Sequence, residues 1–85
     1  MNAFRVWVRP LGNASRVRVD GNQNADWLIG RLSRSFIFKS SEPVRQDDAT
    51  SCCTFQVPYS SWLSCSTFER LLAAIPEVHL MLEPA

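Results

Sequence analysis

The sequence lacks any long apolar run, because arginine, serine, glutamate or proline interrupts each short one. A membrane-spanning helix needs about 18 or more consecutive apolar residues, so we predict no membrane span and no membrane partner. The opening segment Met1-Asn2-Ala3-Phe4-Arg5 and the alternating residues after it contain no apolar core of a signal peptide. We therefore expect a soluble protein of the cytoplasm.

Cysteine, histidine and glycine are all scarce: there are three cysteines, one histidine and three glycines. Small secreted domains use cysteines in even sets as disulfides, so the odd set of Cys52, Cys53 and Cys65 indicates reduced thiols. These thiols and His79 are of zinc-ligand type, but they lack the closely spaced cysteine pair of a zinc knuckle. No glycine-rich phosphate loop or nucleophile elbow is present. We predict no metal, no cofactor and no catalytic residue, and hence a protein that is not an enzyme.

The length of 85 residues suffices for one small domain, and 46% hydrophobic residues suffice for its core. We predict a single domain over residues 1–85. The net charge of +1 favours no class of partner, although the charge is uneven along the chain. Residues 1–45 carry eight basic and three acidic side chains, a net charge of +5, whereas residues 46–85 carry one and five, a net charge of −4. In one compact domain the two halves interleave, so these charges are expected to face each other in part.

Two runs near the N-terminus alternate between apolar and polar residues. The alternation occupies residues 4–9 and 16–19, on either side of the segment Pro10-Leu11-Gly12-Asn13. Alternating β-branched residues around proline, glycine and asparagine are typical of a β-hairpin. The side chains expected to face the core are Phe4, Val6, Val8, Val17 and Val19.

The periodicity becomes helical after Asp20. Apolar residues at i, i+3, i+4 and i+7 predict a helix of about ten residues, with Asn24 as its N-cap and its end near Arg34. The aromatic run Ser35–Lys39 predicts a third strand, and residues 40–51 a long polar loop. The apolar stripe of the helix consists of Ala25, Leu28, Ile29 and Leu32.

The remainder of the chain predicts a strand, a helix and a last strand. Alternation over residues 53–57 indicates a fourth strand, and a single 3₁₀ turn is expected around Trp62-Leu63. Ser66 and Glu69 match a capping box at the start of a helix that Pro76 ends. The helix stripe is Phe68, Leu71, Leu72 and Ile75, and the last strand, residues 77–83, is expected to turn Val78, Leu80 and Leu82 inward.

The expected order ββαββαβ resembles the β-grasp, or ubiquitin-like, architecture over nearly the whole chain, by element order and without a family motif. The resemblance implies an α+β domain with a mixed sheet and helices on one face. Two activities of this architecture are not expected here. A conjugated modifier needs a C-terminal Gly-Gly, whereas this sequence ends Leu82-Glu83-Pro84-Ala85. A plant-type ferredoxin needs more cysteines than the sequence has. With the first strand set aside, the order is βαββαβ, so the alternative is a ferredoxin-like fold with an extra N-terminal strand.

The polar side of the predicted hairpin carries four arginines around one tryptophan. Arginine binds phosphates and carboxylates through paired hydrogen bonds, and tryptophan supplies a stacking surface and is common in protein-binding hot spots. The last strand adds a histidine and a methionine if it pairs with the first. The candidate binding face is Arg5, Trp7, Arg9, Arg16, Arg18, His79 and Met81.

Three interpretations of this face stay open. In the first, the face is only a solvated surface. The outward Glu77 and Glu83 would then pair with the arginines, and an arginine or the 40–51 loop would cover Trp7. In the second, the face binds a protein. In the third, it binds a single-stranded nucleic acid or a phosphate ligand, and the low net charge of the chain is an argument against this interpretation. We predict a small non-enzymatic interaction domain that binds an unidentified protein, with nucleic acid or phosphate as the alternative. The sequence leaves the oligomeric state open.

Overall fold

The alternating runs at the start of the chain form the predicted hairpin. Strand β1 (Phe4–Leu11) pairs antiparallel with β2 (Ala14–Asp20). Gly12 and Asn13 form the tight turn between them, and Gly12 has a φ of 61°, a left-handed conformation that glycine adopts without steric penalty. The strands therefore extend further toward the turn than predicted, and Pro10 lies within β1.

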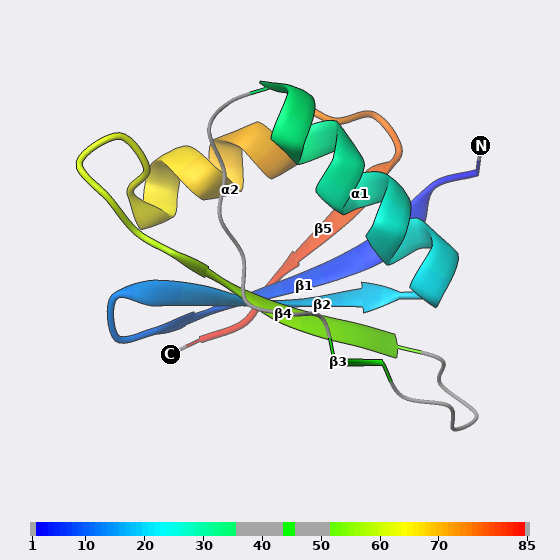
Figure 1. The fold of residues 1–85 in the computed structure, drawn as a ribbon, viewed down its shortest axis with the longest axis horizontal. Coiled ribbons are helices and arrows are strands. Elements are labelled where there is room, and N and C mark those ends of the chain that lie inside the picture. Colours follow the sequence, from blue (N-terminus) through cyan, green and yellow to red (C-terminus); the bar gives the residue numbers. More distant parts are fainter. Residues whose placement is uncertain (1, 36–43, 46–51, 85) are drawn as a thin grey trace.

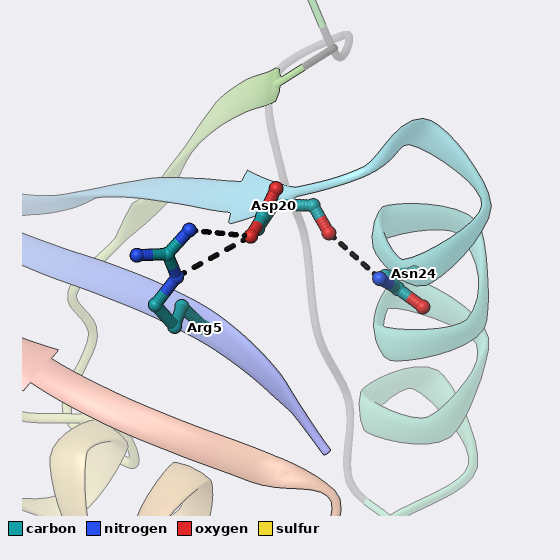
Figure 2. Close-up of polar contacts among 3 residues, drawn as sticks. All are labelled: Arg5, Asp20 and Asn24. Carbon is teal, nitrogen blue, oxygen red and sulfur yellow. Dashed lines mark hydrogen bonds and ion pairs between the residues drawn. The ribbon is translucent and has the colours of Figure 1, made fainter. Parts of the chain in front are cut away.

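Helix α1 (Asn22–Ser35) begins earlier than predicted. The backbone N–H of Ala25 donates to the carbonyl of Gly21 at 3.0 Å, so helical hydrogen bonding starts before Asn24. The side chain of Asn24 does not cap the helix. Its Nδ2 donates to the backbone carbonyl of Asp20 at 2.7 Å, as Figure 2 shows, and thereby ties the first turn of the helix to the end of β2.

The third described strand is not the predicted one. Ser35 is the last residue of α1, and residues 36–39 lie outside the described residues. Strand β3 (Val44–Arg45) lies instead within the segment predicted as a polar loop, and it pairs antiparallel with β4 (Cys52–Pro58). The rest of the predicted loop also lies outside the described part. The computed structural model describes residues 2–35, 44–45 and 52–84.

Helix α2 (Cys65–Ala73) has a different cap from the one predicted. The Oγ of Ser64 accepts a hydrogen bond from the backbone N–H of Thr67 at 3.2 Å, so the cap lies two residues before Ser66. The segment before the helix contains a bend rather than the predicted 3₁₀ turn. Two backbone hydrogen bonds between Ser60 and Leu63, of 3.0 and 3.2 Å, close this bend.

The described strands form one mixed sheet in the order β3-β4-β2-β1-β5. The last strand, β5 (Val78–Leu82), runs parallel to β1, and the other neighbouring pairs are antiparallel. Figure 1 shows α1 and α2 on the same side of the sheet. The structure thus confirms the α+β class, the mixed sheet and the placement of the helices on one face.

The strand order follows the ferredoxin-like alternative more closely than the β-grasp. Strands β2 and β3 are parallel with β4 between them, so β2, α1 and β3 form a split βαβ unit. Strands β4 and β5 are also parallel and are joined through α2, and β1 is inserted between β2 and β5. The β-grasp resemblance holds for the element order and for the parallel β1–β5 pair, but β5 lies at the edge of this sheet rather than inside it.

The core lies between the helices and the covered face of the sheet. It contains the predicted inward side chains of the hairpin and both helix stripes, with Ile29 and Leu71 packed at its margin. Leu82 of the last strand was also predicted to turn inward, but it is 58% exposed. Among the described strands, β5 has a neighbour on one side only, so the end of the strand leaves Leu82 uncovered. The largest fully buried side chains are Phe55, Phe68, Leu28, Leu32 and Leu72.

Candidate binding face of the sheet

The strand registers bring the seven predicted face residues together on the side of the sheet away from the helices. Trp7 lies opposite Arg18 on β2 and opposite Met81 on β5. Neighbouring rows pair Arg9 with Arg16 and Arg5 with His79. Partners in register point to the same side of a sheet, and residues two apart on a strand share a face. The candidate side chains therefore occupy three adjacent rows across β2, β1 and β5.

The indole of Trp7 is covered by arginines of its own face. The guanidinium carbon of Arg18 lies 4.2 Å from the ring centre, and that of Arg5 lies 5.2 Å from it. Both distances are within the range of a cation–π interaction. Trp7 is partly buried, and one expectation of the solvated-surface interpretation, an arginine stacked on the indole, is confirmed.

Arg5 also has a carboxylate partner, which is not one of the two predicted. Its Nη2 and Nε lie 3.1 and 3.3 Å from Oδ2 of Asp20, as Figure 2 shows. The two side chains are 59% and 37% exposed, so the pair contributes roughly 0.2–1 kcal/mol. The hairpin register that pairs Trp7 with Arg18 also places Arg5 opposite Asp20. The contact could therefore have been predicted by extending the hairpin register to the end of β2.

Three other guanidiniums border a hollow in the face. The hollow has a volume of about 200 Å³ and is lined by Arg9, Arg16, Arg18 and Glu83. Glu83 is held beside β1 because its backbone N–H donates to the carbonyl of Val8 at 2.8 Å. Within the described part of the chain, no carboxylate lies within 4.0 Å of these three guanidiniums. The hollow therefore combines three positive charges with one negative charge, which forms no close ion pair with the described residues.

The remaining two predicted residues lie at the β5 side of the face. His79 is exposed beside Arg5, and Met81 is 40% exposed beside Trp7. Met81 thus adds apolar surface next to the indole. This edge of the face is less charged than the edge formed by the hollow.

A polar cluster on the covered side of the sheet was not predicted from the sequence. Ser15 is fully buried, and its Oγ lies 2.7 Å from the hydroxyl oxygen of Tyr59. The Cys65 thiol donates to Oε1 of Glu69 at 3.3 Å. Burial, followed by hydrogen bonding to Cys65, raises the pKa of Tyr59 above 10.0. The available signal was Ser15 itself, which stands at a core position of a strand whose next two core positions are Val17 and Val19.

The thiols do not assemble into a site among the residues described. Cys52 and Cys53 are buried, Cys65 is partly buried, and no disulfide joins these described cysteines. The described ranges contain no group of three or more histidine, cysteine, aspartate or glutamate side chains placed to hold a metal ion.

Comparison with known proteins adds no family to these observations. No protein-family model, no curated protein and no solved structure matches the chain. Neither helix in the described part of the chain is long and apolar enough to cross a membrane.

Proposed function

We propose that this protein is a small non-enzymatic domain that binds another protein through the open face of its sheet. One observation carries the proposal: helices cover one side of the sheet, whereas the other side displays arginines, a tryptophan and a partly exposed methionine. Tryptophan and arginine are enriched among the residues that dominate binding energy at protein interfaces. A uniform solvated surface would not require this combination.

The solvated-surface interpretation explains only part of the face. It accounts for Arg5, which pairs with Asp20, and for the cover on Trp7. It does not account for Arg9 and Arg16, which lie directly opposite each other with no carboxylate of the described residues within 4.0 Å. Like charges opposite each other on neighbouring strands are destabilising, so this pair favours an external acidic partner.

A reducing compartment suits the proposal. Three described cysteines that are not joined in disulfides suit a compartment where thiols are kept reduced, such as the cytoplasm. We include a cytoplasmic location in the proposal on this ground.

Single-stranded nucleic acid is the second candidate, and the hollow is the observation that favours it. Three guanidiniums that form no ion pair within 4.0 Å of a described carboxylate are available to phosphates. If all three contact phosphates, the logarithm of affinity falls against the logarithm of salt concentration with a slope near −2, about 0.7 for each phosphate. Titration of a labelled oligothymidylate at two salt concentrations measures this slope.

The protein-binding proposal is tested by affinity capture with a matched pair of variants. Arg9→Gln/Arg16→Gln removes two charges from the face, and Arg34→Gln/Arg70→Gln removes two exposed charges from the helices. We expect the first variant to lose proteins that the wild type and the second variant both retain. Identical sets of captured proteins from all three would contradict the assignment of the face.

A further inference from the structure

We infer that the hollow bordered by Arg9, Arg16, Arg18 and Glu83 binds a phosphomonoester on a side chain of the partner, so that the partner is a phosphorylated peptide segment. The inference rests on the proposed protein-binding function and names the chemistry that the face recognises. The hollow lies on the open side of the sheet and is reached directly from solvent, because all four of its side chains are exposed.

The charge of the hollow matches a phosphomonoester. Three guanidiniums and one carboxylate give a net charge of +2. A phosphorylated serine, threonine or tyrosine carries about −1.5 to −2 at pH 7, whereas a carboxylate or a phosphodiester carries a single negative charge. The planar fork of arginine also forms paired hydrogen bonds with phosphate oxygens.

The arrangement of the arginines places like charges side by side. Arg9 and Arg16 are register partners across β1 and β2, and Arg18 is two residues from Arg16 on the same face. Among the described residues, Glu83 supplies the one carboxylate that lines the hollow, and it forms no ion pair with them within 4.0 Å. An anion bound between the guanidiniums would relieve their mutual repulsion.

The surroundings of the hollow favour a peptide over a nucleic acid. A base that stacks on Trp7 would have to displace Arg18 and Arg5 from the ring. The partly exposed Met81 lies in the row next to the hollow, two residues along the chain from Glu83. This spacing is about 6.6 Å, the distance between alternate side chains of an extended peptide. A phosphorylated residue with an apolar residue two positions away therefore fits both rows.

Fluorescence anisotropy with short labelled peptides tests the inference. The probe has a central phosphoserine in an alanine-rich sequence with leucine two positions to either side. Its comparators carry serine or glutamate at the centre, and a labelled oligothymidylate represents nucleic acid. We expect the phosphopeptide to bind at least about tenfold more tightly than either comparator peptide, because it alone supplies a dianion and paired hydrogen-bond acceptors.

Variants locate the binding. Arg9→Gln and Arg16→Gln should each weaken binding of the phosphopeptide by about tenfold or more. Arg9→Lys keeps the charge but loses the fork, so it should weaken binding by less than Arg9→Gln. The helix variant Arg70→Gln should bind like the wild type, and circular dichroism confirms that each variant is folded.

The outcomes separate this inference from the proposed function. Equal affinity for the phosphoserine and glutamate peptides, with both weakened by Arg9→Gln, would overturn the phosphate specificity and leave a face that binds acidic protein. Tighter binding of the oligothymidylate than of every peptide would overturn both in favour of nucleic acid. Equal affinity of the wild type, Arg9→Gln, Arg9→Lys and Arg16→Gln for the phosphopeptide would show that the hollow is not its binding site.

Discussion

The guanidinium of Arg18 lies over the ring of Trp7, with 4.2 Å between the guanidinium carbon and the ring centre. The same side chain lines the hollow that Arg9 and Arg16 border. A long arginine side chain loses conformational freedom when it binds a ligand, and a stacking contact already made in the free protein reduces that loss. Trp7 therefore acts as a support that holds one arginine of the hollow in place.

Replacement of Trp7 by alanine should lower the free energy of unfolding by about 1–2 kcal/mol. The loss combines the apolar area of a partly buried indole with its contacts to two arginines. Trp62 is the matched control, because it is 90% exposed, and Trp62→Ala should change stability by less than about 0.5 kcal/mol. Urea unfolding followed by circular dichroism measures both values. Equal effects of the two substitutions would contradict the support that we assign to the Trp7 contacts.

The ion pair between Arg5 and Asp20 should contribute little to stability. Both side chains are partly open to solvent, so a double-mutant cycle of Arg5→Met and Asp20→Asn should give a coupling energy of about 0.2–1 kcal/mol. The coupling should decrease as salt is added. The single substitution of Arg5 should cost more than this coupling, since Arg5 also stacks on Trp7. A coupling that is independent of salt would show that the contact is not an exposed ion pair.

The sequence predicts the hairpin and the shared side of its arginines and Trp7 well, because both depend on a period of two. Alternation alone places Val17 and Val19 on one side of the strand and Arg16 and Arg18 on the other. This separation does not depend on which strands pair. Glu83 was expected to face outward, but its place in the hollow depends on the parallel pairing of β5 with β1, which is a contact between opposite ends of the chain. Local patterns do not encode such a contact.

The ends of the helices were harder to predict, for a local reason. Polar residues that can cap a helix occur at several neighbouring positions, and tertiary contacts decide among them. Asn24 binds the carbonyl at the end of β2 and lies inside α1. Near α2, Ser64 and Ser66 both precede a polar residue by three positions, and the structure uses the first.

The choice between these two serines gives a test of the helix start. Ser64→Ala should cost about 1 kcal/mol of stability, since it leaves the N–H of Thr67 without its side-chain acceptor. Ser66→Ala should change stability by less than about 0.5 kcal/mol, because Ser66 is exposed and, among the described residues, its Oγ hydrogen bonds only with the Oγ of Ser64, at 3.3 Å. Thermal unfolding of the two variants compares them directly. If Ser66→Ala were less stable than Ser64→Ala, the helix would instead start with the capping box of Ser66 and Glu69.

The raised pKa of Tyr59 gives a test on the covered side of the sheet. Burial is the largest cause, and a hydrogen bond with Cys65 and the electrostatic effects of Cys65 and Glu69 raise the pKa further, whereas the hydrogen bond with Ser15 lowers it. The two hydrogen-bond partners therefore act in opposite directions. Ser15→Ala should raise the pKa of Tyr59, and Cys65→Ala should lower it toward 10.0.

Tyr59 is the single tyrosine of the sequence, so the ultraviolet absorbance of tyrosinate reports its titration without interference from another phenol. A folded pKa above the unfolded value means that folding favours the protonated phenol. The stability from this preference is fully present below pH 10 and is lost as the pH rises through the folded pKa. Urea unfolding at increasing alkaline pH should show this loss, and it should be smaller in Cys65→Ala than in the wild type. A shift of the absorbance midpoint in the same direction in Ser15→Ala and Cys65→Ala would contradict the opposed hydrogen bonds of the cluster.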